Sequence, residues 1–107
     1  MQYFELSSVA AERERINDDY FQFLNAGSMS LAVFVLPAGA EDTQQPHAED
    51  EIYYIVSGRA SIRVTGDERP VGPGSIIFVA KEVDHRFLDI SETLTMLVFF
   101  APEHLRV

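Results

Sequence analysis

The 107-residue sequence contains no cysteine and no tryptophan, and it is poor in basic side chains. The absence of cysteine excludes disulfides, thiolate metal ligands and a cysteine nucleophile, so any metal must be bound by His, Asp, Glu or Gln. Eight basic against 17 acidic residues give a net charge of −9, which repels phosphate backbones and anionic lipid surfaces. The composition therefore argues against a nucleic-acid partner.

Long apolar runs are also missing. No stretch approaches the roughly 18 consecutive apolar residues of a membrane span, and no basic segment followed by an apolar one opens the sequence. We therefore expect a cytoplasmic protein without membrane association. Hydrophobic residues nevertheless make up 47% of the chain and include eight phenylalanines, which is enough for the packed core of one domain.

The order of apolar and turn-forming residues predicts an all-β protein with one short helix or turn near its start. Good helix formers fill residues 7–16, and the serines of this stretch can cap a helix. Beyond it, short apolar stretches alternate with Gly, Pro, Asn and Asp at regular spacing, which is typical of a sandwich or barrel. The expected strands are 20–24, 29–36, 45–47, 51–57, 59–65, 75–79, 85–90 and 93–100.

Two of these strands are apolar on both faces, as the runs IYYIV at 52–56 and LTMLVFF at 94–100 show. A small barrel covers only one face of each strand, so the N-terminal segment or a second subunit must cover the other. Large uncovered apolar faces are rare on monomers. We therefore favour a homodimer over a monomer with an apolar surface in contact with solvent.

Four residues are spaced to form a metal site. Gln45, His47 and Glu51 have the same parity, so their side chains project to the same side of a strand. His85, much further along the chain, is the fourth candidate. Imidazole and carboxylate groups are good ligands for divalent iron, manganese, nickel, copper and zinc, whereas an amide oxygen is a weaker ligand. Two histidines and a carboxylate match the pattern of non-haem iron sites.

Each of these residues also has a plainer interpretation. His47 taken alone fits a surface histidine after a proline, and His85 fits a histidine at a strand edge. Glu51 belongs to the acidic run 49–51, which is typical of a solvated turn. Gln45 fits a hydrogen-bonding group behind the ligands as well as it fits a weak ligand.

Two aromatic residues and a third histidine complete the candidates. Tyr53 and Phe87 share the parity of Glu51 and His85, so they are predicted to face the same interior, either as substrate-pocket residues or as ordinary core. His104 lies in a polar C-terminal tail and is expected to be exposed.

The spacing of the metal-site candidates resembles the cupin superfamily. Its first motif is a glycine, five residues, His-x-His, three or four residues, Glu, six residues and a second glycine. The residues at these positions are Gly39, Gln45, His47, Glu51 and Gly58, with Gln45 in place of the first histidine. The six-residue distance to Gly58 selects Glu51 rather than Glu49 as the motif carboxylate.

The second cupin motif is matched less fully. It consists of a glycine, five residues, Pro-x-Gly, two residues, His, three residues and Asn. Gly74 and His85 match in type, whereas Ala80, Glu82 and Asp89 stand at the proline, glycine and asparagine positions.

The resemblance implies a double-stranded β-helix, or jelly-roll barrel. One cupin domain would span 1–107, with an N-terminal segment at 1–19, the barrel at 20–101 and a tail at 102–107. One divalent transition metal (Fe, Mn, Ni, Zn or Cu) would be bound in the barrel mouth. The implied ligands are Gln45, His47, Glu51 and His85.

The resemblance leaves the function open between two classes. The first is a metal-dependent enzyme acting on a small organic molecule, such as a dioxygenase, isomerase or lyase, with Tyr53 as its acid or base. The second is a non-catalytic cupin that binds or senses a small molecule and has a degenerate metal site. An open coordination position on a metal favours the enzyme, and a packed, metal-free interior favours the binding protein.

Overall fold

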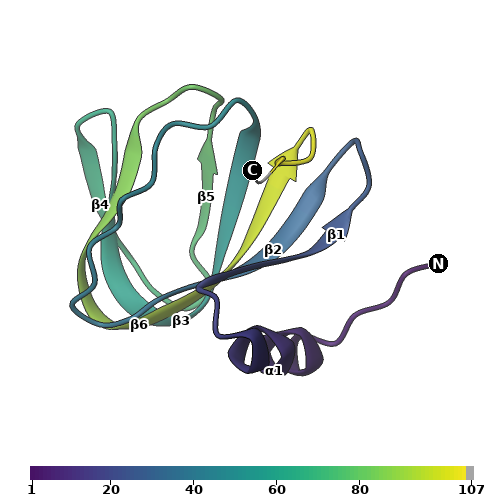
Figure 1. The fold of residues 1–107 in the computed structure, drawn as a ribbon. Helices are drawn as coiled ribbons and strands as arrows, with labels where there is room; N and C mark the ends of the chain where they lie inside the picture. Colours follow the sequence, from purple (N-terminus) through teal and green to yellow (C-terminus); the bar gives the residue numbers. More distant parts are fainter. Residues whose placement is uncertain (106–107) are drawn as a thin grey trace.

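The computed structural model describes residues 1–105 as one helix followed by six antiparallel strands (Figure 1). This confirms the predicted all-β fold with a short N-terminal helix. No helix of the described residues is long and apolar enough to cross a membrane. The elements are α1 Leu6–Ile16, β1 Tyr20–Asn25, β2 Ser30–Leu36, β3 Asp50–Val64, β4 Asp67–Val71, β5 Ile76–Val79 and β6 His85–Ala101.

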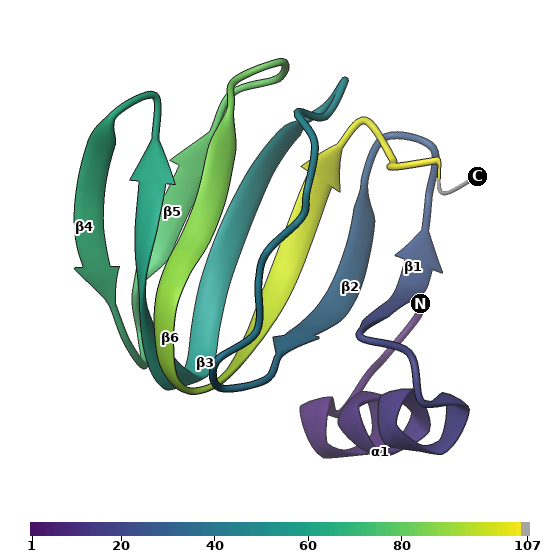
Figure 2. The ribbon, with the colours of Figure 1, turned by 60° about the vertical axis from the view of Figure 1, so that its left-hand side comes forward.

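Two long strands, β3 and β6, organise the sheet. The strand order is β1-β2-β6-β3-β4, and β5 also pairs with β3. The first half of β3 pairs with β5 and the end of β6, whereas its second half pairs with β4 and the start of β6. Both strands bend strongly, so the sheet curls around an interior (Figure 2).

The bend explains why β3 and β6 were each predicted as two strands. The expected strands 51–57 and 59–65 leave Gly58 between them, but β3 continues through this glycine with φ at 94°. The pairing with β6 shifts register repeatedly between Ile55 and Ser61. Such irregularities, with glycine in the left-handed region, bend a strand without ending it.

The predicted strand at 45–47 is wrong. Residues 37–49 connect β2 to β3 without forming a strand, and Figure 2 shows this connection passing in front of the curled sheet. Pro46 lacks the N–H group that pairing needs. The connection is therefore a loop that delivers side chains to the interior from outside the sheet.

Apolar side chains fill the interior, and the helix covers part of the outer surface. Tyr53 and Ile55 of β3 lie opposite Val98 and Met96 of β6, and all four are almost completely buried. On the outside, α1 packs on β1 and β2, where Val33 is fully buried. The helix begins after Glu5, which makes no side-chain capping bond, so the expected serine cap is not used.

Candidate metal centre

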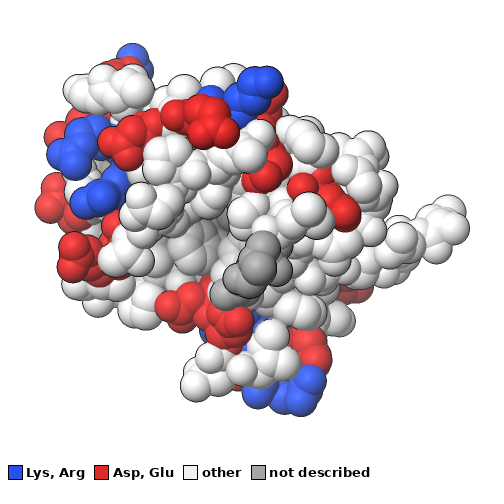
Figure 3. Space-filling model, turned by 45° about the horizontal axis from the view of Figure 1, so that its top comes forward, with Lys and Arg blue, Asp and Glu red and all other residues white. Residues whose placement is uncertain are grey.

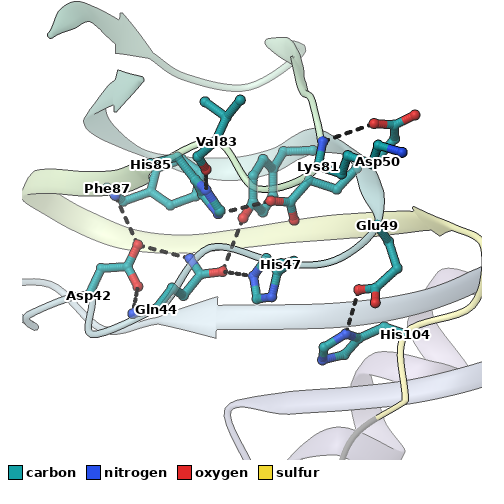
Figure 4. A network of polar contacts seen from close by, with 12 residues as sticks. Asp42, Gln44, His47, Glu49, Asp50, Lys81, Val83, His85, Phe87 and His104 are labelled. Carbon is teal, nitrogen blue, oxygen red and sulfur yellow. Dashed lines mark hydrogen bonds and ion pairs between the residues drawn. The ribbon is translucent and has the colours of Figure 1, made fainter. Parts of the chain in front are cut away.

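The structure brings His47, Glu51 and His85 together, and Figure 4 shows the His47 and His85 side chains in the same network of polar contacts. One potential ligand atom from each residue lies within 4.8 Å of the other two. His47 comes from the 37–49 loop, Glu51 from the start of β3 and His85 from the start of β6. In the sheet His85 is paired with Val64, at the opposite end of β3 from Glu51. Only the curl of the sheet therefore lets the two side chains meet.

The contact between Glu51 and His85 leaves two buried polar atoms without hydrogen-bond partners in the part of the chain that the structure describes. Both residues are buried, with 2% of their surface exposed, and Nε2 of His85 lies 2.8 Å from Oε1 of Glu51. This approach does not have the alignment of a hydrogen bond, and the described residues offer no hydrogen-bond partner to Nε2 or to Oε2 of Glu51. Buried polar atoms without partners are rare because they are costly.

The tautomer of His85 determines which group its Nε2 presents to Glu51. Nδ1 lies 3.0 Å from the carbonyl oxygen of Val83, which can only accept, so Nδ1 carries the proton. In the neutral ring Nε2 then presents a lone pair to the Glu51 carboxylate, and the two repel each other. The arrangement requires a positive charge between them, either a proton or a metal ion. The same arrangement, with one imidazole nitrogen bonded to a carbonyl, is typical of histidine metal ligands.

The pKa values of the two histidines are shifted in opposite directions. Burial lowers the pKa of His85. The opposing effects of the Glu51 carboxylate, the Val83 carbonyl and the Asp42 charge are together larger, so the pKa lies above its ordinary value. For His47, burial lowers the pKa, and the attraction of Glu51 offsets this only in part. His47 is therefore neutral at pH 7, as a metal ligand must be.

A chain of hydrogen bonds orients His47. The carboxylate of buried Asp42 accepts hydrogen bonds from the backbone and side-chain amides of Gln44, at 3.1 and 2.9 Å, and from the backbone N–H of Phe87 at 2.9 Å. The Gln44 amide oxygen, turned inward, accepts bonds from Nε2 of His47 at 3.2 Å and from the Tyr53 hydroxyl at 3.1 Å. The second ring nitrogen of His47 remains available to a cation.

Gln45 lies outside this group. Its side chain is exposed and its amide nitrogen is 3.5 Å from the carbonyl oxygen of Thr43. The expectation that residues 45 and 47 share a face depended on strand alternation, which a loop does not have. Gln44 takes the inward position instead. The local signal for it is Asp42, because an aspartate often bonds the backbone two residues later.

Tyr53 and Phe87 are buried next to the metal-site candidates. Their rings pack edge to face with centroids 5.0 Å apart, and the Tyr53 ring lies 6.0 Å from that of His85. Burial, and then the charge of Glu51, raises the pKa of Tyr53 well above its ordinary value of 10.0. The Tyr53 hydroxyl therefore keeps its proton at neutral pH.

The C-terminal tail also reaches this region. The sequence did not predict this approach. The expectation that His104 is exposed is wrong. Its side chain is 22% accessible, and its Nδ1 lies 2.7 Å from Oε1 of Glu49. The ring stacks on Phe100 at 4.5 Å and lies 5.2 Å from the ring of His47. No local pattern marks His104, because its partners lie far away in the sequence.

A small cavity opens beside His47. Its volume is about 180 Å³, which corresponds to about six water molecules at the density of the liquid. Aromatic rings and one valine form most of its wall, to which no lysine or arginine of residues 1–105 contributes. The lining residues are Tyr20, Phe34, Gln44, His47, Val98, Phe100 and His104.

The sequence is similar to a known domain family and to a known protein. The sequence model described as "Cupin domain" matches residues 32–100. The uncharacterized protein SCO3923 of Streptomyces coelicolor is 44% identical over 102 residues, which cover 95% of this chain and 97% of that protein.

Two solved structures resemble the fold over nearly the whole chain. TT1209 from Thermus thermophilus superposes with a TM-score of 0.77 at 22% identity and covers 97% of this chain and 100% of its own. Ectoine synthase from P. lautus superposes with a TM-score of 0.78 at 20% identity, covering 97% of this chain and 80% of its own. At these identities the likeness concerns the fold alone.

Proposed function

The chain belongs to the cupin-domain family, and we propose that it holds one divalent transition-metal ion between His47, Glu51 and His85. The observation that carries this proposal is the lone pair of His85 Nε2 facing the buried Glu51 carboxylate. Two imidazoles and a carboxylate suit Fe, Mn, Ni, Zn or Cu. Held by His47, Glu51 and His85, such an ion would supply Lewis-acid chemistry toward a small molecule, or in the case of iron the activation of dioxygen.

The surroundings of the three proposed ligands support a small, largely apolar substrate or ligand. The cavity beside His47 has mostly aromatic walls, and none of the described residues that line it is a lysine or arginine. Figure 3, which brings the top of Figure 1 forward, shows a hollow among uncharged side chains with acidic residues on its margins. A highly charged anion finds few partners there.

Within this proposal the other residues have distinct roles. Gln44, rather than Gln45, is the amide that holds His47, and Asp42 holds Gln44. Tyr53, whose hydroxyl is protonated, serves as a proton donor rather than a base in an enzyme such as a dioxygenase, isomerase or lyase. Unchanged turnover in Tyr53→Phe, once a substrate is known, would remove Tyr53 from that role.

The second candidate function is a non-catalytic binding protein without a metal. A proton on His85 also satisfies its contact with Glu51, and the raised pKa of His85 favours that state. In this case the cavity captures a small molecule and no reaction follows. Metal content separates the two functions.

Elemental analysis of protein purified without an affinity tag tests the proposal. We expect about one equivalent of a transition metal in the wild type, less than about a tenth of an equivalent in His47→Ala and a clearly lower content than wild type in His85→Ala, because two of the three ligands hold the ion only weakly. Gln45→Ala is the matched control and should keep its metal. A wild-type protein that contains no transition metal and cannot be reconstituted supports the binding protein instead.

We also propose that two copies of the chain associate through the outer face of β3 and β5. The helix packs on β1 and β2 and makes no comparable contact with β3 or β5. Ile52 and Tyr54 are each 39% exposed, and their partners Phe78 and Ile76 on β5 are 62% and 70% exposed. An apolar face of this kind is typical of subunit interfaces.

Light scattering coupled to gel filtration tests the dimer. The wild type should have twice the chain mass of 12.0 kDa, and Phe78→Asp should have the mass of one chain, because a carboxylate cannot be buried in the apolar interface. Ile16→Asp, which alters an exposed apolar residue of α1, should remain dimeric. A monomeric wild type at micromolar concentration excludes this assembly.

A further inference from the structure

The C-terminal tail is fixed against the β1–β2 hairpin by several hydrogen bonds. The backbone N–H of His104 donates to the Ser30 hydroxyl at 3.0 Å, and its carbonyl accepts from the Gln22 amide at 2.8 Å. Glu103 and Gly27 exchange two further bonds, each at 3.1 Å. The backbone position of His104 is therefore set by contacts that do not involve His47 or Glu51.

This ring faces two other potential metal ligands. Glu49 lies on the 37–49 loop two residues after His47, and one ligand atom from each of His47, Glu49 and His104 lies within 4.8 Å of the other two. In Figure 4 the Glu49 and His104 side chains point toward each other on the side of His47 away from His85. All three residues are only partly buried.

We propose that His47, Glu49 and His104 form a second, outer metal-binding position at the mouth of the barrel. Two imidazoles and one carboxylate select a first-row ion that accepts nitrogen ligands, such as Zn²⁺ or Co²⁺, over Mg²⁺ or Ca²⁺. The ordered tail reduces the conformational freedom that binding must remove. The outer position is distinct from the inner one, because neither Glu51 nor His85 belongs to it.

His47 is common to the two positions, so their occupancies are coupled. The inner residues Glu51 and His85 are 2% exposed, whereas the side chains of Glu49 and His104 are 12% and 22% accessible. An ion arriving from solvent therefore meets the outer group first. The outer position serves as the entry point for the ion that the inner group holds.

Co²⁺ titration of variants in two backgrounds tests the outer position. In His85→Ala, which disables the inner group, the protein should still bind Co²⁺ with a ligand-field absorption spectrum, and adding His104→Ala should weaken binding by about tenfold or more. Glu49→Gln should have a similar effect. Glu41→Gln removes the same charge from an exposed position of the same loop and should change the affinity less than about twofold.

The possible outcomes separate the two metal positions. Failure of His85→Ala to bind Co²⁺, equal affinities with and without His104, or equal effects of Glu49→Gln and Glu41→Gln each overturn the outer position. If the His85→Ala variant lacks the metal that the wild type contains, this result concerns the inner group alone. If His85→Ala does not fold by circular dichroism, the isosteric Glu51→Gln provides the background for the same comparison.

Discussion

Replacing Gly58 by alanine is expected to lower the free energy of unfolding by about 4 kcal/mol, which is among the largest effects of a single substitution. A Cβ atom at this position would lie 2.1 Å from the carbonyl oxygen of Thr93 and 2.8 Å from Cα of Leu94. These are backbone atoms of the partner strand, so β3 and β6 would have to separate at their common bend. Urea unfolding followed by far-UV circular dichroism measures the loss.

Gly74→Ala is the matched control for this experiment. Gly74 has nearly the same backbone conformation, with φ at 90° against 94° for Gly58, but a Cβ atom there has no neighbour within 4 Å. Its replacement should cost only the strain of a left-handed residue, about 1 to 2 kcal/mol. Equal losses in the two variants would show that backbone conformation, and not the close strand contact, sets the requirement for glycine at position 58.

The second large effect is expected for Asp42→Ala. The Asp42 carboxylate is 2% exposed and accepts bonds from Phe87 N and from both amide groups of Gln44. Without it, the buried N–H of Phe87 has no partner, and Gln44 is free to rotate away from His47. We expect a loss of about 3 kcal/mol in unfolding free energy and weaker metal binding by about tenfold.

The neighbouring carboxylate provides the comparison for Asp42. Glu41 is exposed, and Glu41→Ala should change the unfolding free energy by less than about 0.5 kcal/mol. Urea unfolding and metal titration on both variants measure the two quantities. If Asp42→Ala unfolds at the same urea concentration as Glu41→Ala, the buried hydrogen bonds do not stabilise the loop as we infer.

The sequence predicted the parts of the site that follow from motif spacing and from strand alternation. The all-β jelly roll of the cupin superfamily is confirmed, and the motif spacing named His47, Glu51 and His85, which the structure brings together. Glu51 and His85 begin long strands, so their sides in the sheet follow from alternation along each strand. The six-residue distance to Gly58 identified the acidic residue that is buried.

Other parts of the site could not be predicted, because they depend on irregular or distant structure. Alternation favoured Gln45, but the loop has no period of two, and bonds from Asp42 turn Gln44 inward instead. His104 seemed a tail residue of no consequence. Its neighbours Ser30 and Glu49 lie 74 and 55 residues away in the chain, and no local pattern records such contacts.

The pairing of β3 with β6 has a consequence for how the protein folds. Glu51 is adjacent to Phe100 in the sheet, although nearly half of the chain separates them. Loops of this length close slowly, and folds dominated by such pairings reach the native state in milliseconds to seconds. The proposed metal site, which needs His85 beside His47 and Glu51, therefore has no complete precursor in any local segment. An ion held there, as we propose, would be retained only after these slow contacts have formed.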